Sequence, residues 1–307
     1  MPNLNTVYDN FFLSNEIEDQ FNSHLDLQSF CTIDNTLTGV AGMVRKIHKY
    51  SATSGTEKLA VGVGNTKTIA ATYTEKEYRI LLAQNRFAYY DEEAMTDPMV
   101  VTTGTRHAGT DLFNTANGDI YSAFNEATMV LPVTTLGFDA FVDAVAMLNL
   151  ENLEGVQIFA FVNPGDMAKL RKVLKDDLKY VEAFAKSGYV GTVGGVNIYT
   201  KKDAETGKVV VATKEAVTLF NKKGTEVEQE REQNTRKNTV YSRKYYLAAM
   251  TNETKAVKIM AGYTAAKTTD TDVSSSKTYY VEKGIGYVEV ASPKKADIST
   301  YYEITAA

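Results

Sequence analysis

Residues 97–127 read DPMVVTTGTRHAGTDLFNTANGDIYSAFNEA, and this stretch decides the fold. Asp97 is a favoured N-cap residue, and Pro98 suits the first position of a helix. Apolar side chains then recur at spacings of three, four or seven residues, at Val101, Ala108, Leu112, Ala116, Ile120, Phe124 and Ala127. This spacing predicts one long amphipathic helix. Each of its three glycines costs the helix about 1 kcal/mol relative to Ala, so contacts with the rest of the chain must stabilise it.

The sequence before this helix predicts extended strands. Residues 78–82 and 86–90 are aromatic and aliphatic, with charged residues interspersed, and this composition is typical of β-strands. A Gly- and Thr-rich stretch between Lys58 and Thr72 predicts turns or a mobile tip. Because a two-stranded ribbon is marginally stable alone in water, its apolar face must be covered by its own domain or by a neighbouring chain.

The sequence after the helix alternates between helical and strand periods. One helix face is formed by Phe138, Phe141, Val142 and Val145. Residues 156–162 predict a buried strand that ends at Asn163-Pro164-Gly165, and Asp166 is expected to cap the helix that follows. Further strands with tight turns are predicted over residues 189–199 and 209–212. The pattern predicts a compact α/β domain.

The two ends of the chain differ from the middle. Residues 9–27 predict a short amphipathic helix with one apolar stripe, formed by Leu13, Ile17, Phe21 and Leu25. Residues 225–261 are strand-like but heavily charged. Residues 264–278 contain mostly Thr, Ser, Asp and Lys, which predicts a linker. The Tyr-rich stretches beyond it predict a small β appendage that forms a separate unit.

Composition limits the possible classes of protein. The chain has 307 residues and is 44% hydrophobic, enough for one core and a smaller appendage. Its net charge of −5 argues against a protein that grips nucleic acid, although not against one that surrounds it. No apolar run approaches the ~20 residues that span a bilayer. The start of the chain does not resemble a signal peptide, and the single Cys31 cannot form an internal disulfide, which together favour the cytoplasm.

Residues that usually carry chemistry are few. The three histidines, His24, His48 and His107, are far apart in the sequence and fall on different predicted elements. Residues 62–68 are Gly-rich but lack the spacing of a phosphate-binding loop. No zinc-ligand, nucleophile-elbow or dinucleotide-binding motif occurs. We therefore predict no catalytic residue, no cofactor and no metal site, and interpret Cys31 as a packed side chain.

The order of these parts resembles that of the tailed-phage major capsid protein. Its shell fold, also called the Johnson or Hong-Kong-phage-type fold, occurs in herpesviruses and encapsulins as well. The resemblance covers roughly residues 10–262 and includes a strand–Asn-Pro–helix step at residues 161–164 and a glycine hairpin at residues 190–198. Residues 227–231 and 241–246 resemble the strands that return to the family's peripheral domain.

The resemblance implies an α+β fold made of consecutive parts. These are an N-terminal arm, 1–42; an extended β-hairpin loop, 43–93; a peripheral domain with a spine helix, 94–131; an α/β axial domain, 132–224; a return to the peripheral domain, 225–262; and a linker with a C-terminal β appendage, 263–307. Because nothing precedes the arm in this sequence, the resemblance implies a separate scaffolding protein, or none, rather than a fused one.

The resemblance also implies a function. Copies of the chain are expected to form hexamers and pentamers of an icosahedral head shell that encloses double-stranded phage DNA without sequence-specific binding. A portal and possible decoration proteins are further expected partners, and no membrane is involved. The chain is expected in the virion, assembled in the cytoplasm of a bacterial host.

Seven residues are candidates for contacts between subunits. Arg79 and Arg86, expected on the ribbon, are candidates for ion pairs with a neighbouring copy. The acidic cluster Asp91, Glu92 and Glu93 supplies candidates of opposite charge. The adjacent apolar candidates are Ile80 and Leu82.

Two other classes of protein remain open at this point. An encapsulin-like compartment shares the fold but encloses enzymes, and the N-terminal arm favours the virus over it. Another phage structural protein, such as a tail component, would lack the long helix between the ribbon and the α/β domain. The enzyme hypothesis ranks last because of the poor inventory of catalytic groups.

Overall fold

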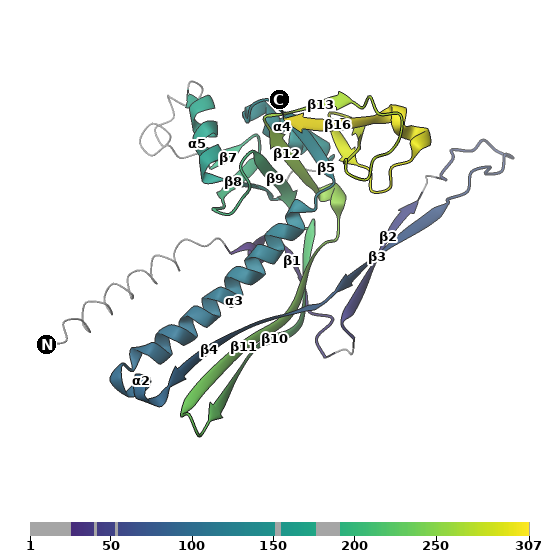
Figure 1. Ribbon diagram of the computed structural model, residues 1–307. Coiled ribbons are helices and arrows are strands. Elements are labelled where there is room, and N and C mark those ends of the chain that lie inside the picture. Colours follow the sequence, from purple (N-terminus) through teal and green to yellow (C-terminus); the bar gives the residue numbers. More distant parts are fainter. Residues whose placement is uncertain (1–25, 40–41, 53–54, 151–154, 176–190, 307) are drawn as a thin grey trace.

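The computed structural model describes residues 26–39, 42–52, 55–150, 155–175 and 191–306 (Figure 1). The strands of these residues form a four-stranded, a ten-stranded and a two-stranded sheet. The helix predicted from the apolar stripe at residues 9–27 lies outside the described residues, except for its last two positions. There the chain forms a short 3₁₀ turn, η1 (Leu27–Phe30).

The long helix predicted first is confirmed. It is α3 (Met99–Asn125), and a short helix, α2 (Asp91–Thr96), precedes it. Its N-cap is Pro98 rather than the predicted Asp97, one residue later, although Asp97 Oδ1 still accepts a hydrogen bond from Met99 N at 2.9 Å. Figure 1 shows α3 lying along the four-stranded sheet. One glycine has a packing role, since a Cβ at Gly104 would lie only 2.2 Å from the ring of Phe87.

The four-stranded sheet has the order β1-β10-β11-β4. Its strands are β1 (Thr32–Asp34), β4 (Leu81–Tyr90), β10 (Val217–Glu232) and β11 (Lys237–Met250). Alternate residues of β4 are half-buried and exposed, as expected for a sheet with one covered face. The half-buried residues, such as Phe87, face α3, and the other face of this sheet is open.

The ten-stranded sheet has the order β13-β16-β14-β15-β5-β12-β9-β6-β8-β7. Its central elements are β5 (Met129–Val133), β6 (Ile158–Val162), β7 (Thr192–Val193), β8 (Val196–Thr200), β9 (Lys208–Thr213) and β12 (Ala256–Ala261), with η2 (Glu253–Lys255) before β12. Helices α4 (Phe138–Met147) and α5 (Pro164–Val173) pack against the core on one face. The end of α3 covers the other face, where Phe124 contacts Phe159 and Phe161 and Ile120 belongs to the same buried cluster. The predicted buried strand and the glycine hairpin are therefore confirmed as β6 and β7–β8.

The predicted cap of α5 was wrong by three residues. The N-cap is Asn163, whose Oδ1 accepts from Gly165 N at 2.8 Å, and Pro164 occupies the first turn. Asp166 is buried within the helix and accepts from Gly207 N at 2.5 Å. Asp166 therefore fixes the loop before β9 rather than the start of the helix.

The predicted ribbon contained one strand too many. The two-stranded sheet pairs β2 (Val44–Ala52) with β3 (Ala71–Arg79), with residues 55–70 as its tip. The next strand, β4, leaves the ribbon after Ile80 and pairs with β11 in the four-stranded sheet. Ladder pairing with a strand some 150 residues later in the chain outweighs the proximity of β3 and β4 in the sequence.

The prediction of a separate C-terminal unit was wrong. The predicted linker begins with β13 (Tyr263–Lys267), and the tail adds β14 (Tyr280–Lys283), β15 (Gly286–Glu289), η3 (Lys295–Thr300) and β16 (Tyr301–Ala306). These strands extend the central sheet, because β15 pairs with β5. The side chain of Met147 occupies the space that a Cβ of Gly286 would need. The tail is thus part of the central core.

Candidate assembly surfaces

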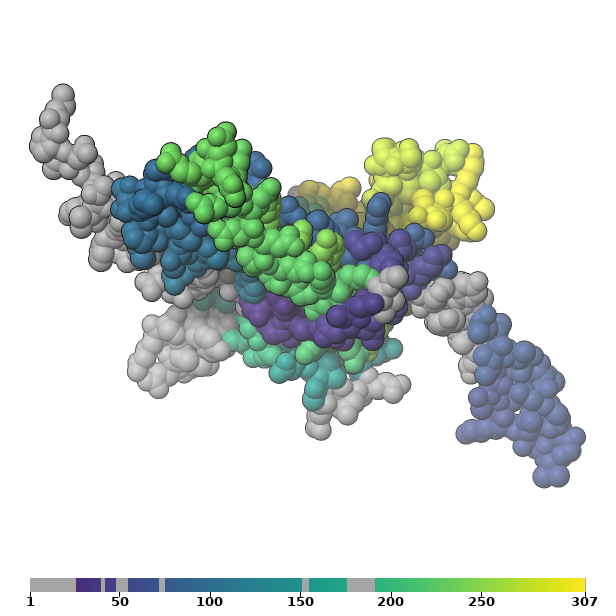
Figure 2. Space-filling view, turned by 90° about the horizontal axis from the view of Figure 1, so that it is seen from below, coloured from purple at the N-terminus to yellow at the C-terminus, as the bar shows by residue number. Residues whose placement is uncertain are grey.

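Almost every residue of the ribbon tip is exposed. The ribbon projects away from the body in Figures 1 and 2, with its tip at the far end. Its two strands have nine residues each, and these pair one to one, from Val44 with Arg79 to Ala52 with Ala71. It therefore has the geometry of a long arm without a core of its own.

The ribbon tip has an internal structure that leaves its apolar side chains outside. Glu57 accepts hydrogen bonds from both the backbone N (2.9 Å) and the hydroxyl of Thr66 (3.1 Å). Asn65 Nδ2 donates to Gly55 O at 3.2 Å. The large exposed apolar side chains around these contacts are Leu59, Val61, Val63 and Ile69. Sequence reasoning predicted turns or a mobile tip here and did not identify these exposed apolar residues as a candidate contact surface.

The open face of the four-stranded sheet is a second exposed surface. The exposed residues of β4 on this face include Leu82, Arg86 and Tyr90. On the neighbouring strands, Arg243 forms ion pairs with Glu226 and Glu228. The face therefore carries apolar, aromatic and charged groups side by side, a mixture typical of protein interfaces.

The structure separates the predicted ion-pair candidates into two groups. Arg79 ends β3 at the base of the ribbon, and Arg86 lies on the open face of β4. The acidic cluster already has partners within the chain. Asp91 binds Arg231 at 2.6 Å and Glu92 binds Arg236 at 2.6 Å.

The remaining candidates have mixed environments. Glu93 accepts a hydrogen bond from Tyr90 N at 3.0 Å, which stabilises the start of α2. Of the apolar candidates, Ile80 is buried at the junction between ribbon and body, whereas Leu82 is exposed. The structure thus brings Leu82 and Arg86 onto one face and leaves Ile80 in the interior of the chain.

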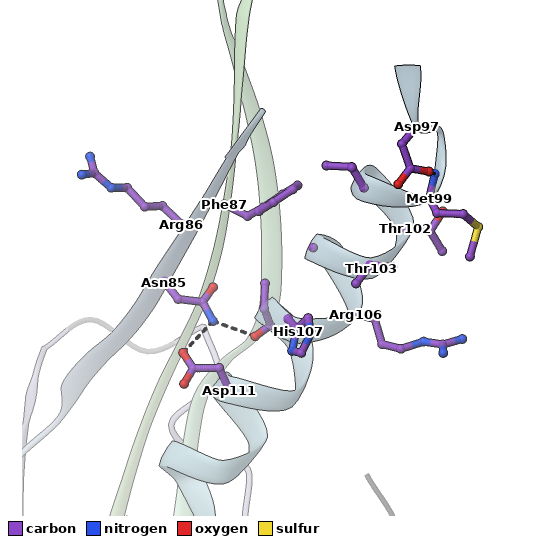
Figure 3. A pocket seen from close by; sticks show the side chains of 13 residues that line it. Asn85, Arg86, Phe87, Asp97, Met99, Thr102, Thr103, Arg106, His107 and Asp111 are labelled. Carbon is purple, nitrogen blue, oxygen red and sulfur yellow. Dashed lines mark hydrogen bonds between the residues drawn. The ribbon is translucent and has the colours of Figure 1, made fainter. Parts of the chain in front are cut away.

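A pocket of about 500 Å³ lies between β4 and the first half of α3 (Figure 3). The residues that line it include Phe87, Gly104 and His107; the side chain of Arg86, which also borders it, points away from α3 in Figure 3. Asn85 Nδ2 spans the inner side, donating to Ala108 O at 2.6 Å and to Asp111 Oδ2 at 3.1 Å. The lining therefore mixes apolar side chains with a few polar and charged ones.

The described residues offer little for catalysis. Among them, no group of three His, Cys, Asp or Glu side chains lies close enough to hold a metal ion. Cys31 is fully buried, and burial raises the pKa of its thiol to about 11, so it is a poor nucleophile at neutral pH. Across the described ranges, no helix is both long and apolar enough to cross a membrane.

Comparison with known proteins points to viral shells. No protein-family model matches the chain. The chain is 27% identical over 259 residues to the major capsid protein of Staphylococcus phage phiMR11. The aligned residues cover 79% of this chain and 89% of that protein.

Solved structures show the same fold at lower identity. The capsid of Ralstonia phage GP4 is 11% identical with a TM-score of 0.59, covering 76% of this chain and 87% of that one. A virus-like particle from Pyrococcus furiosus is 12% identical with a TM-score of 0.52, and the match covers 79% of this chain and 95% of that one. At these identities the likeness shows the fold, which is that of shell-forming capsid subunits.

Proposed function

We propose that this chain, which has the tailed-phage major capsid fold, is a structural protein that assembles with copies of itself into the shell of a phage head. The observation that carries the proposal is the ribbon. Its tip holds four large apolar side chains, Leu59, Val61, Val63 and Ile69, that are between 47% and 105% exposed. The relationship to a phage major capsid protein supports the same role.

The physical logic favours assembly over independence. Exposed apolar patches of a soluble protein commonly mark surfaces that bind another protein. A ribbon that reaches from one copy to the next makes head-to-tail contacts, and such contacts close into rings when the rotation between copies allows it. Each contact is modest, but many are made at once. We expect roughly 2,000 Å² or more to be buried per subunit.

The proposal extends to finer features that the resemblance implies. The rings are hexamers and pentamers of an icosahedral shell, with a portal, possible decoration proteins and a separate scaffold as partners. The shell encloses double-stranded DNA, and a subunit with a net charge of −5 does so without gripping it. Leu82 and Arg86, on the open face of β4, are the proposed contact residues. The shell forms in the cytoplasm of a bacterial host, and the subunit has no enzymatic activity.

The test is expression of the full chain followed by size-exclusion chromatography and electron microscopy. We expect closed particles, tubes or capsomer rings in the excluded fractions. A well-behaved monomer of 33.8 kDa at all concentrations would overturn the proposal.

The contents of particles distinguish the phage shell from its nearest rival. In infected cells, particles of a phage head hold double-stranded DNA. Particles that hold a defined enzyme instead would support an encapsulin-like compartment. The similarity in sequence to a phage capsid protein favours the first outcome.

A further inference from the structure

The base of the ribbon has one face turned toward the body. Opposite residues of an antiparallel pair share a face, so the pairs Arg45–Tyr78 and Ile47–Lys76 place four side chains on one side. The other side carries Lys46, which pairs with Glu75 at 2.5 Å within the ribbon. The two faces of the ribbon therefore have different partners.

Three side-chain contacts join the inner face to the body. Lys76 Nζ lies 3.2 Å from Glu126 Oε2, just beyond the end of α3. The hydroxyl of Tyr78 donates to Met250 O at 3.2 Å. The guanidinium of Arg45 lies over the ring of Phe220, 5.5 Å from its centre. Only the first of these joins two full charges of opposite sign.

The backbone connection between ribbon and body is narrow. Ile80 is the single residue between β3 and β4. Its N donates to Met43 O at 2.7 Å, next to the start of β2. Gly42 precedes Met43 with φ of 107°, a conformation that favours glycine. The two strands of the ribbon thus meet the body at one closely spaced pair of residues, which is the arrangement of a hinge.

The space beside the hinge is not filled. A groove of about 970 Å³ lies between the ribbon base and the edge of the four-stranded sheet, lined by Asp34, Ile47 and Thr218 among others. Arg45 borders the same groove, and its Nε is buried without a hydrogen-bond partner in the described part of the chain. An unpartnered buried donor is unfavourable, so this orientation of the ribbon leaves one polar group at its base unsatisfied.

We propose that the ion pair between Lys76 and Glu126 is the latch that sets the angle at which the ribbon pivots about Met43 and Ile80. A strand of nine residues is roughly 30 Å long, so a rotation of about 10° at the hinge moves the far end by about 5 Å. The latch therefore determines where the apolar tip lies before it meets a second copy. The pivot concerns the single subunit, whereas its consequence for assembly rests on the proposed function.

The pivot is tested by measuring distances between two spin labels on the full chain. Labels at Val61→Cys, on the tip, and Thr105→Cys, on α3, report the ribbon angle. Cys31 is fully buried, so it does not compete for the label. Labelled protein is diluted with unlabelled protein so that only distances within one subunit contribute.

Two substitutions with the same change in charge form the matched pair. Lys76→Met removes the latch, and Lys46→Met removes an ion pair that stays within the ribbon; the two lysines are 51% and 54% exposed. We expect Lys76→Met to shift the population away from the latched distance by about two- to fivefold, the size expected of one exposed ion pair. Lys46→Met is expected to leave the distribution unchanged.

Further variants decide the cause. Glu126→Gln should reproduce the effect of Lys76→Met, and the swap Lys76→Glu with Glu126→Lys should restore the latched distance. An unchanged distribution in Lys76→Met, or an equal shift in Lys46→Met, would overturn the latch. Because the distances are measured within single subunits, these outcomes are independent of whether particles form. Particle counts for the same variants then test the consequence for assembly.

Discussion

Every side chain of β6, from Ile158 to Val162, is buried, whereas Leu59, Val61 and Val63 at the ribbon tip are 47%, 105% and 57% exposed. Both segments carry aliphatic side chains, yet one lies between α4–α5 and α3 and the other lies in solvent. Burial of such groups is worth about 25 cal/mol per Å² wherever it takes place. In β6 the gain is realised on folding, and at the tip it remains available for association.

The contrast teaches where stability and assembly reside in this chain. The central sheet should determine whether the subunit folds, and the ribbon should determine whether folded subunits join. Variants can therefore be chosen to affect one property without the other.

The largest effect is expected from removing residues 263–307. If the tail only decorated the shell, its loss would leave the subunit intact. Because β15 pairs with β5 and the tail covers one end of the core, we expect the free energy of unfolding to fall by more than about 5 kcal/mol, beyond ordinary single substitutions. Urea unfolding and soluble yield measure this. The control is Ile285→Ala in the exposed β14–β15 turn, and an equally stable truncated chain would restore the view of a separate appendage.

The next effect concerns the core alone. Phe161 is fully buried among Phe30, Tyr121, Phe124 and Phe159. Phe161→Ala should lower the free energy of unfolding by about 3–5 kcal/mol, because it removes the ring and leaves a cavity.

The control for this variant is a second phenylalanine. Phe138→Ala, at a position 52% exposed, should cost less than half as much in urea unfolding. Equal losses at both positions would contradict the assignment of Phe161 to the core.

A smaller effect, with opposite signs at two glycines, tests the packing of α3. Gly104→Ala should destabilise the subunit by about 1–3 kcal/mol, since the new methyl group would overlap the ring of Phe87. Gly109, five residues later, has open space around it. Gly109→Ala should therefore stabilise the helix by up to about 1 kcal/mol. Thermal unfolding of both variants measures the difference, and two changes of the same sign would contradict the packing of α3 against Phe87.

The smallest effect on stability is expected at the tip. Replacing Leu59, Val61 and Val63 together by Ser should change the free energy of unfolding by less than about 0.5 kcal/mol, since these side chains are exposed. The concentration needed for particle formation should nevertheless rise at least about tenfold, which corresponds to ~1.4 kcal/mol of lost association energy. Light scattering and electron microscopy measure it, with Thr68→Ser as the control. Normal assembly of the triple variant would show that the tip is not a contact surface.

Much of the fold was predictable because the signals are local. Asp97 and the spacing of apolar residues after it identified α3, and an uninterrupted apolar run identified β6. Two glycines with positive φ, Gly194 and Gly195, form the turn of the predicted β7–β8 hairpin. In each case a few neighbouring residues are sufficient for the structure that forms.

The errors arose where partners are distant in the sequence. The alternation in β4 is the same whether the strand pairs in a ribbon or with β11, and no neighbouring residue identifies the partner strand. Asp91 lies 140 residues from Arg231 in the sequence, so an ion pair within the chain could not be told from one between chains. The tail strands likewise join β5 across more than 150 residues.

The single residue between β3 and β4 limits how this protein can change length over evolutionary time. Ile80 sits where the inward and outward alternation of β3 passes into that of β4. One inserted residue there would exchange the two faces of the following strand and turn Phe87 away from α3. Insertions in the tip would shift no register in the body. New variants of the arm are therefore expected to differ in reach and in their outermost residues, while its root keeps a constant length.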